Sequence, residues 1–150
     1  EGPRLAVFGG SSGGEFLSSL ERYDPSTNAW EEEAMAPMLT ARRFVGTAVL
    51  DSKLYAVGGV IEEDGAPSNL VERYDLATNA WEAVAPMATA RDGHAVAALD
   101  GKLYAVGGHG GFNNGVLSSV ERYDPALDVW EVVAPMAQAR YKLAVAVLDG

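Results

Sequence analysis

Three side chains of this 150-residue sequence could together hold a metal ion: Asp92, His94 and His109. Imidazole and carboxylate groups are common ligands of zinc and other divalent metals. Asp92 and His94 stand two residues apart at the start of a predicted strand, where alternate side chains share a face. His109 directly follows two glycines, so all three could converge on one rim. A loop histidine beside glycines is usually just solvated, and we therefore expect no metal site and no cofactor.

Other catalytic chemistries find less support. The sequence contains no cysteine, which excludes disulfides, thiolate metal sites and a cysteine nucleophile. No serine stands in the setting of a nucleophile elbow. The formal net charge is −10, and the charges that bind phosphates and anionic membranes are those of Lys and Arg. We therefore predict that the protein is not an enzyme and binds neither nucleic acid nor membranes.

The sequence also bears on the origin of the chain and on where the protein is located. No run approaches 18 apolar residues, so no transmembrane helix is expected. The first residues do not form a signal peptide and lack an initiator Met, as in an excised or engineered chain. Together with the lack of cysteine, this favours a cytoplasmic location.

The elements that must position these residues repeat three times. Each unit contains a diglycine, then a Glu-Arg-Tyr-Asp run, a tryptophan seven residues after the tyrosine, Ala-Pro-Met and finally Ala-Arg. Successive diglycines are 49 residues apart. The glycines and aromatic residues of the three units are Gly9, Gly10, Tyr23 and Trp30; Gly58, Gly59, Tyr74 and Trp81; and Gly107, Gly108, Tyr123 and Trp130.

Each unit is predicted to form four short strands, named a to d. In the third unit, strand a covers 95–99 and a turn at Asp100-Gly101 leads to strand b at 103–106. A variable loop follows, then strand c at 119–123 and a strand d that carries Trp130. No segment has a sustained 3.6-residue apolar period, so almost no helix is expected.

This pattern resembles the kelch family over essentially the whole chain. The resemblance implies an all-β propeller with one four-stranded blade per repeat around a central channel. Glycine lets another backbone or a ring approach closely, and Tyr and Trp supply flat apolar area between blades. The repeated residues are therefore interpreted as structural, and pairs such as Glu72-Arg73 as structural ion pairs. The predicted units are 1–38 with a terminal strand at 139–149, then 39–87 and 88–136.

Three blades do not close a ring, because propellers have about four to eight blades. The chain starts within a strand b at 4–8 and ends with a strand a at 143–148, so two chains could complete each other. We expect a homodimer that forms a six-bladed ring with strand exchange, since two-fold symmetry is the commonest. Head-to-tail assembly into another ring size is the alternative.

The resemblance also implies a recognition face. In kelch domains of ubiquitin-ligase adaptors, peptides contact the b–c loops and the residues after the strand-a arginine. When the second and third units are aligned at an offset of 49 residues, 60–70 and 109–119 match at no position, although the flanking strands nearly coincide. Variable loops on a constant scaffold often carry function. The candidates are Ser11, Ser12 and Phe16, then Val60, Glu62, Glu63 and Asp64, then His109, Phe112, Asn113 and Asn114 on the loops, and Arg43, Phe44, Asp92, Gly93, Tyr141 and Lys142 after the arginines.

The leading hypothesis is a protein- or peptide-interaction module. Only Arg43 and Lys142 are basic among the candidates, so a neutral or basic peptide fits at least as well as an acidic one. A designed or excised self-assembling half-propeller without a native ligand is the second reading. A kelch-fold enzyme or a sugar- or metal-binding propeller is the third, but the Tyr–Cys pair of the copper oxidases is impossible here.

Overall fold

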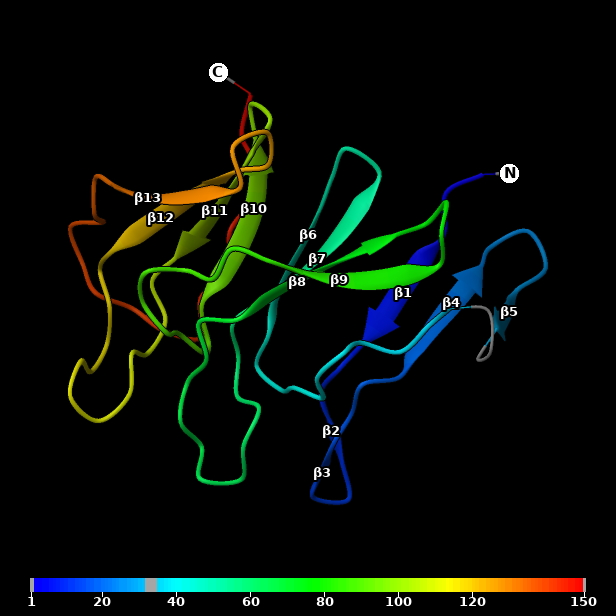
Figure 1. Cartoon of the computed structure of the whole chain (residues 1–150), viewed down its shortest axis with the longest axis horizontal. Coiled ribbons are helices and arrows are strands. Elements are labelled where there is room, and N and C mark those ends of the chain that lie inside the picture. Colours follow the sequence, from blue (N-terminus) through cyan, green and yellow to red (C-terminus); the bar gives the residue numbers. More distant parts are fainter. Residues whose placement is uncertain (1, 32–34, 150) are drawn as a thin grey trace.

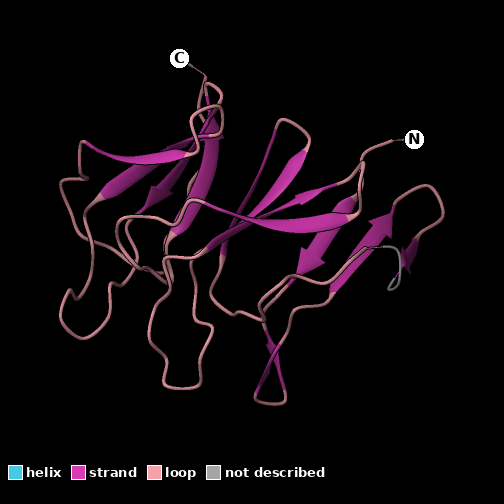
Figure 2. Cartoon of the chain, viewed as in Figure 1, coloured by secondary structure: helices cyan, strands magenta, loops and turns pink. Residues whose placement is uncertain are grey.

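The computed structural model describes residues 2–31 and 35–149, and every regular element among them is a β-strand (Figures 1 and 2). Within the described residues the strands form four antiparallel sheets: a two-stranded hairpin and three larger sheets, which we call blades 1, 2 and 3. Blade 1 holds β1 (Leu5–Phe8), β4 (Leu20–Asp24) and β5 (Ala29–Glu31); blade 2 holds β6 (Gly46–Leu50), β7 (Lys53–Val57), β8 (Val71–Asp75) and β9 (Ala80–Val84); blade 3 holds β10 (Ala95–Leu99), β11 (Lys102–Val106), β12 (Val120–Asp124) and β13 (Val129–Val133). This part of the chain has no helix with the length and hydropathy needed to cross a membrane.

Local sequence signals explain the strand boundaries. Asp51 and Ser52 have φ of 50° and 60°, and Asp100 and Gly101 have 49° and 74°. Two consecutive positive φ values define the type I′ turn, whose twist matches that of a two-stranded hairpin. The predicted strand a at 95–99 coincides with β10, and the other third-unit strands agree within one residue at most ends. The all-β prediction is confirmed.

The b–c loop of the first unit differs from the expected irregular loop. It contains a short hairpin of β2 (Ser11–Ser12) and β3 (Glu15–Phe16). Gly13 and Gly14 form its turn with φ of 59° and 88°. A Gly-Gly pair is one of the dipeptides that this turn prefers, so the signal was present in the sequence.

The apolar core lies between blades rather than within one sheet. Tyr55 and Val57 of blade 2 pack with Leu103 and Tyr123 of blade 3. A second cluster joins blades 1 and 2 through residues that include Leu20, Tyr74 and Trp81. Tyr and Trp also pair across strands c and d of the same blade, as Tyr123 and Trp130 do with ring centroids 5.2 Å apart. Each blade is therefore stabilised chiefly by its neighbours.

Bare glycine backbone receives a carbonyl group here, not an aromatic ring. A Cβ on Gly58 would lie 2.6 Å from the carbonyl oxygen of Arg91, and one on Gly107 would lie 2.6 Å from that of Arg140. The tryptophans pack elsewhere, for example Trp81 against Phe8 with centroids 5.8 Å apart. Of the two predicted neighbours of the diglycines, backbone or a ring, the backbone entering the next strand a is therefore the nearest, and no Tyr or Trp ring is among the nearest atoms at Gly58 and Gly107.

The predicted Glu-Arg ion pairs exist, but with other partners. Adjacent residues of a strand point to opposite faces. Arg73 therefore pairs with Glu82 on the neighbouring strand. Glu72 points toward blade 1 and pairs with Arg42 at 2.6 Å, with both side chains almost fully buried. The interpretation as structural ion pairs holds, whereas the pairing of neighbours in sequence does not.

Blade 1 has three strands, and the predicted strand at 143–148 is not formed. This is a correction with a simple cause: a β-strand requires a partner for its hydrogen bonds, and no strand of the described residues pairs with this segment. Residues 143–149 run next to blade 3 and are mostly exposed (Figure 1). Assignment of 139–149 to the first unit remains a prediction.

Candidate functional site

The three b–c loops extend from the same end of the blades. In Figure 1 the β2–β3 hairpin, the green loop after β7 and the yellow loop after β11 all lie at the lower edge. The turns that join β6 to β7 and β10 to β11 lie at the opposite end. The loop residues chosen from the sequence therefore share one side of the molecule, which we call the rim.

Backbone bridges join the two sets of predicted residues. Arg43 and Val60 exchange two N–H···O bonds of 3.0 and 2.8 Å. Asp92 and His109 do the same one blade further on, at 3.1 and 2.8 Å. In blades 2 and 3 the residue that follows the strand-a arginine is thus fixed to the b–c loop of the same blade. The structure brings together residues that are 17 positions apart in sequence.

A second set of bonds links one blade to the next along the rim. The N–H of Gly93 donates to the carbonyl of Phe44 at 3.4 Å, and the N–H of Lys142 donates to that of Gly93 at 2.6 Å. All three residues have φ between 53° and 58°, the left-handed region. These equivalent positions form a continuous backbone path across the rim.

Cations and aromatic rings alternate on this surface. The Arg43 guanidinium lies 4.6 Å from the ring centroid of Phe16 and 5.2 Å from that of Phe44. Further along, the ring of Tyr141 lies 6.0 Å from that of His109 and 5.5 Å from the Lys142 ammonium. Such contacts hold the cations in place while their hydrogen-bonding groups stay available.

Asp92 is the carboxylate at the centre of these cations. Burial raises its pKa, while the positive charges of His109, Arg43 and Lys142 oppose that rise. Arg43 in addition has a buried Nε without a hydrogen-bond partner in the described part of the chain. The centre of the rim is therefore a patch of mixed charge.

The outer rim is more acidic and more exposed. Glu62, Glu63 and Asp64 are exposed on the blade 2 loop, where Asp64 accepts a hydrogen bond from the N–H of Ala66. Phe112 is fully exposed on the blade 3 loop, and Val60 is 2% exposed. Val60 therefore supports the rim from beneath, and its assignment as a contact residue stays a prediction. Also exposed are Ser11, Ser12, Asn113 and Asn114.

The three candidate metal ligands do not converge. Gly93 has φ +58°, which breaks the alternation that would put Asp92 and His94 on one face. His94 instead points between blades 2 and 3, where a Cβ on Gly46 would meet its Nε2 at 2.7 Å. The described residues contain no group of three potential metal ligands. The shared face expected for Asp92 and His94 is wrong.

His94 is a buried histidine, on which a backbone interaction with Val57 acts only as the smallest influence. Its equivalents in the other repeats are the aliphatic Val45 and Leu143. Neither ring nitrogen has a hydrogen-bond partner within the described residues. Burial, with the nearby charge of Arg91, lowers the pKa of His94 from 6.5 to about 4. The imidazole is neutral in the folded chain at neutral pH.

This burial makes stability depend on pH. Between pH 6.5 and pH 4 the unfolded chain binds a proton at His94 that the folded chain excludes, so the free energy of unfolding falls as the pH falls. From pH 7 to pH 5 we expect wild type to lose about 2 kcal/mol more than His94→Val, at about 1.4 kcal/mol for each pKa unit. Urea unfolding at both pH values measures this. Parallel losses in the two proteins would contradict the assignment.

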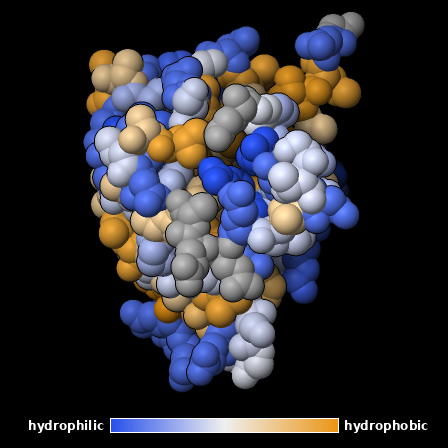
Figure 3. Space-filling view, turned by 90° about the vertical axis from the view of Figure 1, so that its right-hand side faces the viewer, coloured by the Kyte–Doolittle hydropathy of each residue, from blue (hydrophilic) through white to orange (hydrophobic). Residues whose placement is uncertain are grey.

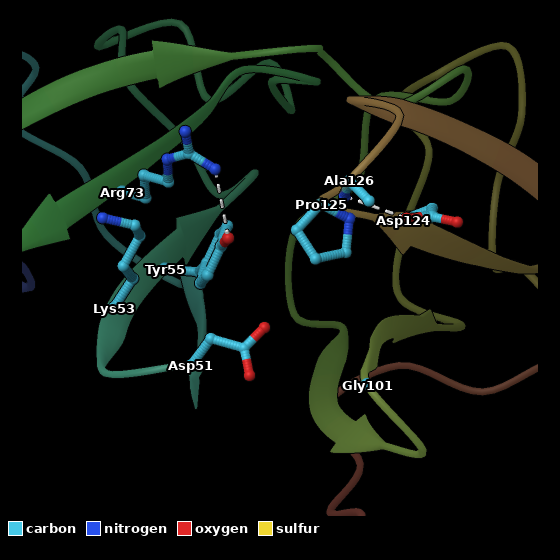
Figure 4. Close-up of a pocket in the computed structure, with 8 residues that line it drawn as sticks. All are labelled: Asp51, Lys53, Tyr55, Arg73, Gly101, Asp124, Pro125 and Ala126. Atoms are coloured by element: carbon cyan, nitrogen blue, oxygen red, sulfur yellow. Dashed lines mark hydrogen bonds between the residues drawn. The ribbon is translucent and has the colours of Figure 1, made fainter.

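A cleft of about 390 Å³ lies at the opposite end, between blades 2 and 3 (Figure 4). Its basic groups are already paired, Lys53 with Asp75 and Arg73 with Glu82. A comparable cavity between blades 1 and 2 is lined by Arg4 and Arg22, the equivalents of Lys53 and Arg73. Because the groove recurs at each junction, it belongs to the architecture. The residues that line the first cleft are Asp51, Lys53, Tyr55, Arg73, Gly101, Asp124, Pro125 and Ala126.

Sequence reasoning missed the polar network between blades. The buried Arg42 donates to the carbonyls of Gly58 and Leu70 as well as to Glu72. Arg91 repeats this in blade 3 with Glu121 at 2.7 Å. A constant separation of 30 residues between each arginine and its glutamate was the available signal.

Four-stranded antiparallel sheets that pack through repeated aromatic and Arg–Glu contacts are the blades of a β-propeller. Residues 1–149 match the KLHDC2/KLHL20/DRC7 Kelch-repeats domain, and the chain belongs to the kelch-repeat family.

Similar proteins include the F-box/kelch-repeat protein At1g22040 of Arabidopsis thaliana, 42% identical over 79 residues, or 51% of this chain and 16% of the relative. Human Kelch-like protein 33 is 39% identical over 83 residues, or 53% of this chain and 15% of the relative. Kelch-like protein 7 of Rattus norvegicus is 36% identical over 74 residues, or 49% and 12%. The matched parts thus cover 12–16% of the length of these relatives.

Proposed function

We propose that this chain is a non-catalytic interaction module that binds a protein or peptide segment across the rim. The observation that carries the proposal is the joining of the b–c loops to the residues after the strand-a arginines, through the Arg43–Val60 and Asp92–His109 bridges. A rigid scaffold thereby presents loops whose sequences differ between repeats. This division between constant support and variable contact is typical of binding surfaces.

The chemistry of the rim favours a segment without strong negative charge. The exposed Glu62, Glu63 and Asp64 would repel an acidic peptide. Arg43 is held by Phe16 and Phe44 and faces Asp92, so part of its charge is already balanced. The exposed Phe112 offers an apolar anchor of the kind that dominates binding energy at interfaces.

We further propose that the interaction module is a six-bladed ring in which a second copy of this chain supplies three blades. A ring of six blades lies within the range of known propellers, whereas three blades leave two open faces. Two-fold closure uses the same pair of surfaces twice.

Peptide selection tests the role of the rim. Random 12-residue peptides displayed on phage are selected on the wild-type chain, and their affinities are measured by calorimetry. Phe112→Ser should weaken the selected peptides by at least about tenfold, a loss of 1.4 kcal/mol, because it removes an exposed apolar anchor. The control is Leu127→Ser, which alters a residue that is 71% exposed in the c–d turn at the other end. Equal affinity of both variants would contradict the proposal.

A further inference from the structure

The two outer blades expose complementary halves of one interface. Between blades 1 and 2, Arg42 is 1% exposed and bonds Glu72; between blades 2 and 3, Arg91 is 0% exposed and bonds Glu121. The third arginine of this series, Arg140, is exposed beyond blade 3. The third glutamate, Glu21, is exposed on blade 1, and within the described residues these two form no ion pair.

The backbone groups around each glutamate repeat in the same way. Glu72 accepts hydrogen bonds from the N–H groups of Leu39 and Thr40. Glu121 accepts from those of Ala88 and Thr89 at 2.7 and 3.2 Å. The corresponding donors for Glu21 are the N–H groups of 137 and 138, at the other side of the molecule.

The tryptophans repeat the pattern of the ion pairs: Trp81 and Trp130 are bonded to the preceding repeat, whereas Trp30 is exposed. The indole N–H of Trp81 donates to the carbonyl of Ala36 at 2.8 Å, and that of Trp130 donates to the carbonyl of Ala85 at 2.8 Å. Trp81 is 7% exposed as a result. Trp30 is 50% exposed, and the matching carbonyl is that of Ala134 on the far blade. Figure 3 views the chain from the blade 1 side, where hydrophobic residues lie among hydrophilic ones.

Gly10 leaves a space that the backbone of another segment fills at the equivalent glycines. A Cβ on Gly59 would lie 2.6 Å from the carbonyl oxygen of Arg43, and one on Gly108 would lie 2.7 Å from that of Asp92. Gly10 has the same left-handed conformation, with φ +86°, yet nothing lies within 4 Å of its Cβ position. The residue that continues the series Arg43, Asp92 is Tyr141.

The free edge of β1 matches the unpaired segment 143–148. Blade 2 pairs Gly46 of its inner strand with Val57. Shifted by one repeat, this register sets Ala144 opposite Phe8 and places Val145 opposite Val7. Val7 is 49% exposed, whereas its equivalents Ala56 and Ala105 are 0% exposed. An inner strand on this edge would bury Val7.

We infer that a second copy of this chain provides these missing groups and contributes residues to the rim. Its Arg140 bonds Glu21, its segment 143–148 becomes the inner strand of blade 1, and its Tyr141 pairs with Ser11 as Arg43 pairs with Val60. The blade 1 part of the rim is then composite: Ser11 and Phe16 of one copy lie beside Tyr141 and Lys142 of the other. This inference rests on the proposed function and specifies how its ring is closed.

Charge reversal at the two ends provides the test. Arg140→Glu and Glu21→Arg each place like charges at both junctions, so each variant alone should be a folded monomer. An equimolar mixture should form a 1:1 heterodimer, because both junctions then join opposite charges again. Sedimentation velocity gives the masses and far-UV circular dichroism confirms folding. We expect single variants to raise the dimer dissociation constant at least about 100-fold and the mixture to restore it.

One further variant tests the proposed interface at another position, and a second serves as a control. Gly10→Ala should fold but fail to dimerise, because its Cβ would occupy the site of the incoming carbonyl. Glu63→Arg makes the same charge change as Glu21→Arg on an exposed loop and should keep the wild-type mass. A wild-type mass other than that of two chains, or no heterodimer in the mixture, overturns the inference. Peptide binding that depends on Phe112 in such a monomer would leave the proposed binding function standing.

Discussion

Arg91→Ala should lower the free energy of unfolding by about 3–5 kcal/mol, the usual cost of leaving one partner of a buried ion pair alone. Arg91 is 0% exposed and donates to the carbonyls of Gly107 and Ser119 and to the carboxylate of Glu121. Its removal leaves a buried carboxylate without its cation and takes the guanidinium donor from the carbonyls of Gly107 and Ser119, of which that of Ser119 keeps the N–H of Gly107. Urea unfolding followed by tryptophan fluorescence measures the loss.

The matched control is Arg73→Ala. Arg73 also pairs with a glutamate, but its side chain is 22% exposed and that of Glu82 is 55% exposed. Pairs of this kind contribute about 0–1 kcal/mol. Both substitutions are made in the R140E background, so that dimer dissociation does not add to the measured stability. Similar losses for the two variants would show that the buried network does not hold the blades together.

Gly58→Ala is expected to destabilise the chain by roughly 2–5 kcal/mol. Gly58 has φ +63°, a conformation that costs a residue with a Cβ about 1–2 kcal/mol. The added Cβ would also lie 2.6 Å from the backbone oxygen of Arg91 and 2.9 Å from the His94 ring. Backbone cannot move aside as a flexible side chain can, so the overpacking adds roughly 1–3 kcal/mol.

Gly101→Ala separates the two causes. Gly101 has φ +74°, but no atom lies within 4 Å of its Cβ position. This variant should lose only the conformational part, about 1–2 kcal/mol, in the same urea unfolding experiment. If Gly58→Ala were no more costly than Gly101→Ala, the close carbonyl contact would not be what requires the diglycine.

The strand pattern could be predicted from local signals in the sequence. Asp100-Gly101 predicts a tight hairpin turn because only a few residue types adopt two positive φ values. The Tyr-to-Trp spacing predicts neighbouring strands c and d, and Tyr123 indeed lies opposite Trp130. The grouping of the b–c loops at one end followed from the repeat, because equivalent loops of equivalent blades must point the same way.

Contacts between distant segments could not be predicted from the sequence in the same way. The Arg42–Glu72 pair joins the segment before strand a to strand c, and apart from the constant spacing of 30 residues nothing in the residue types indicates that the two side chains meet. The position of His94 could not be foreseen either, because the positive φ of Gly93 rotates the backbone just before it. The burial of Val60 depends on its bridge to Arg43, which alternation along a strand does not reveal.

The amino-acid sequence alone determined the repeat, the strand order and the loops that vary, since turns and apolar alternation are local and recur at a fixed spacing. Only the tertiary structure decided which groups meet across blades. It placed Arg91 in blade 3, His94 between two blades and carbonyls against the diglycines, and it left Arg140 and Glu21 exposed at opposite ends. Such contacts depend on the packing of whole sheets, whose geometry no single repeat encodes.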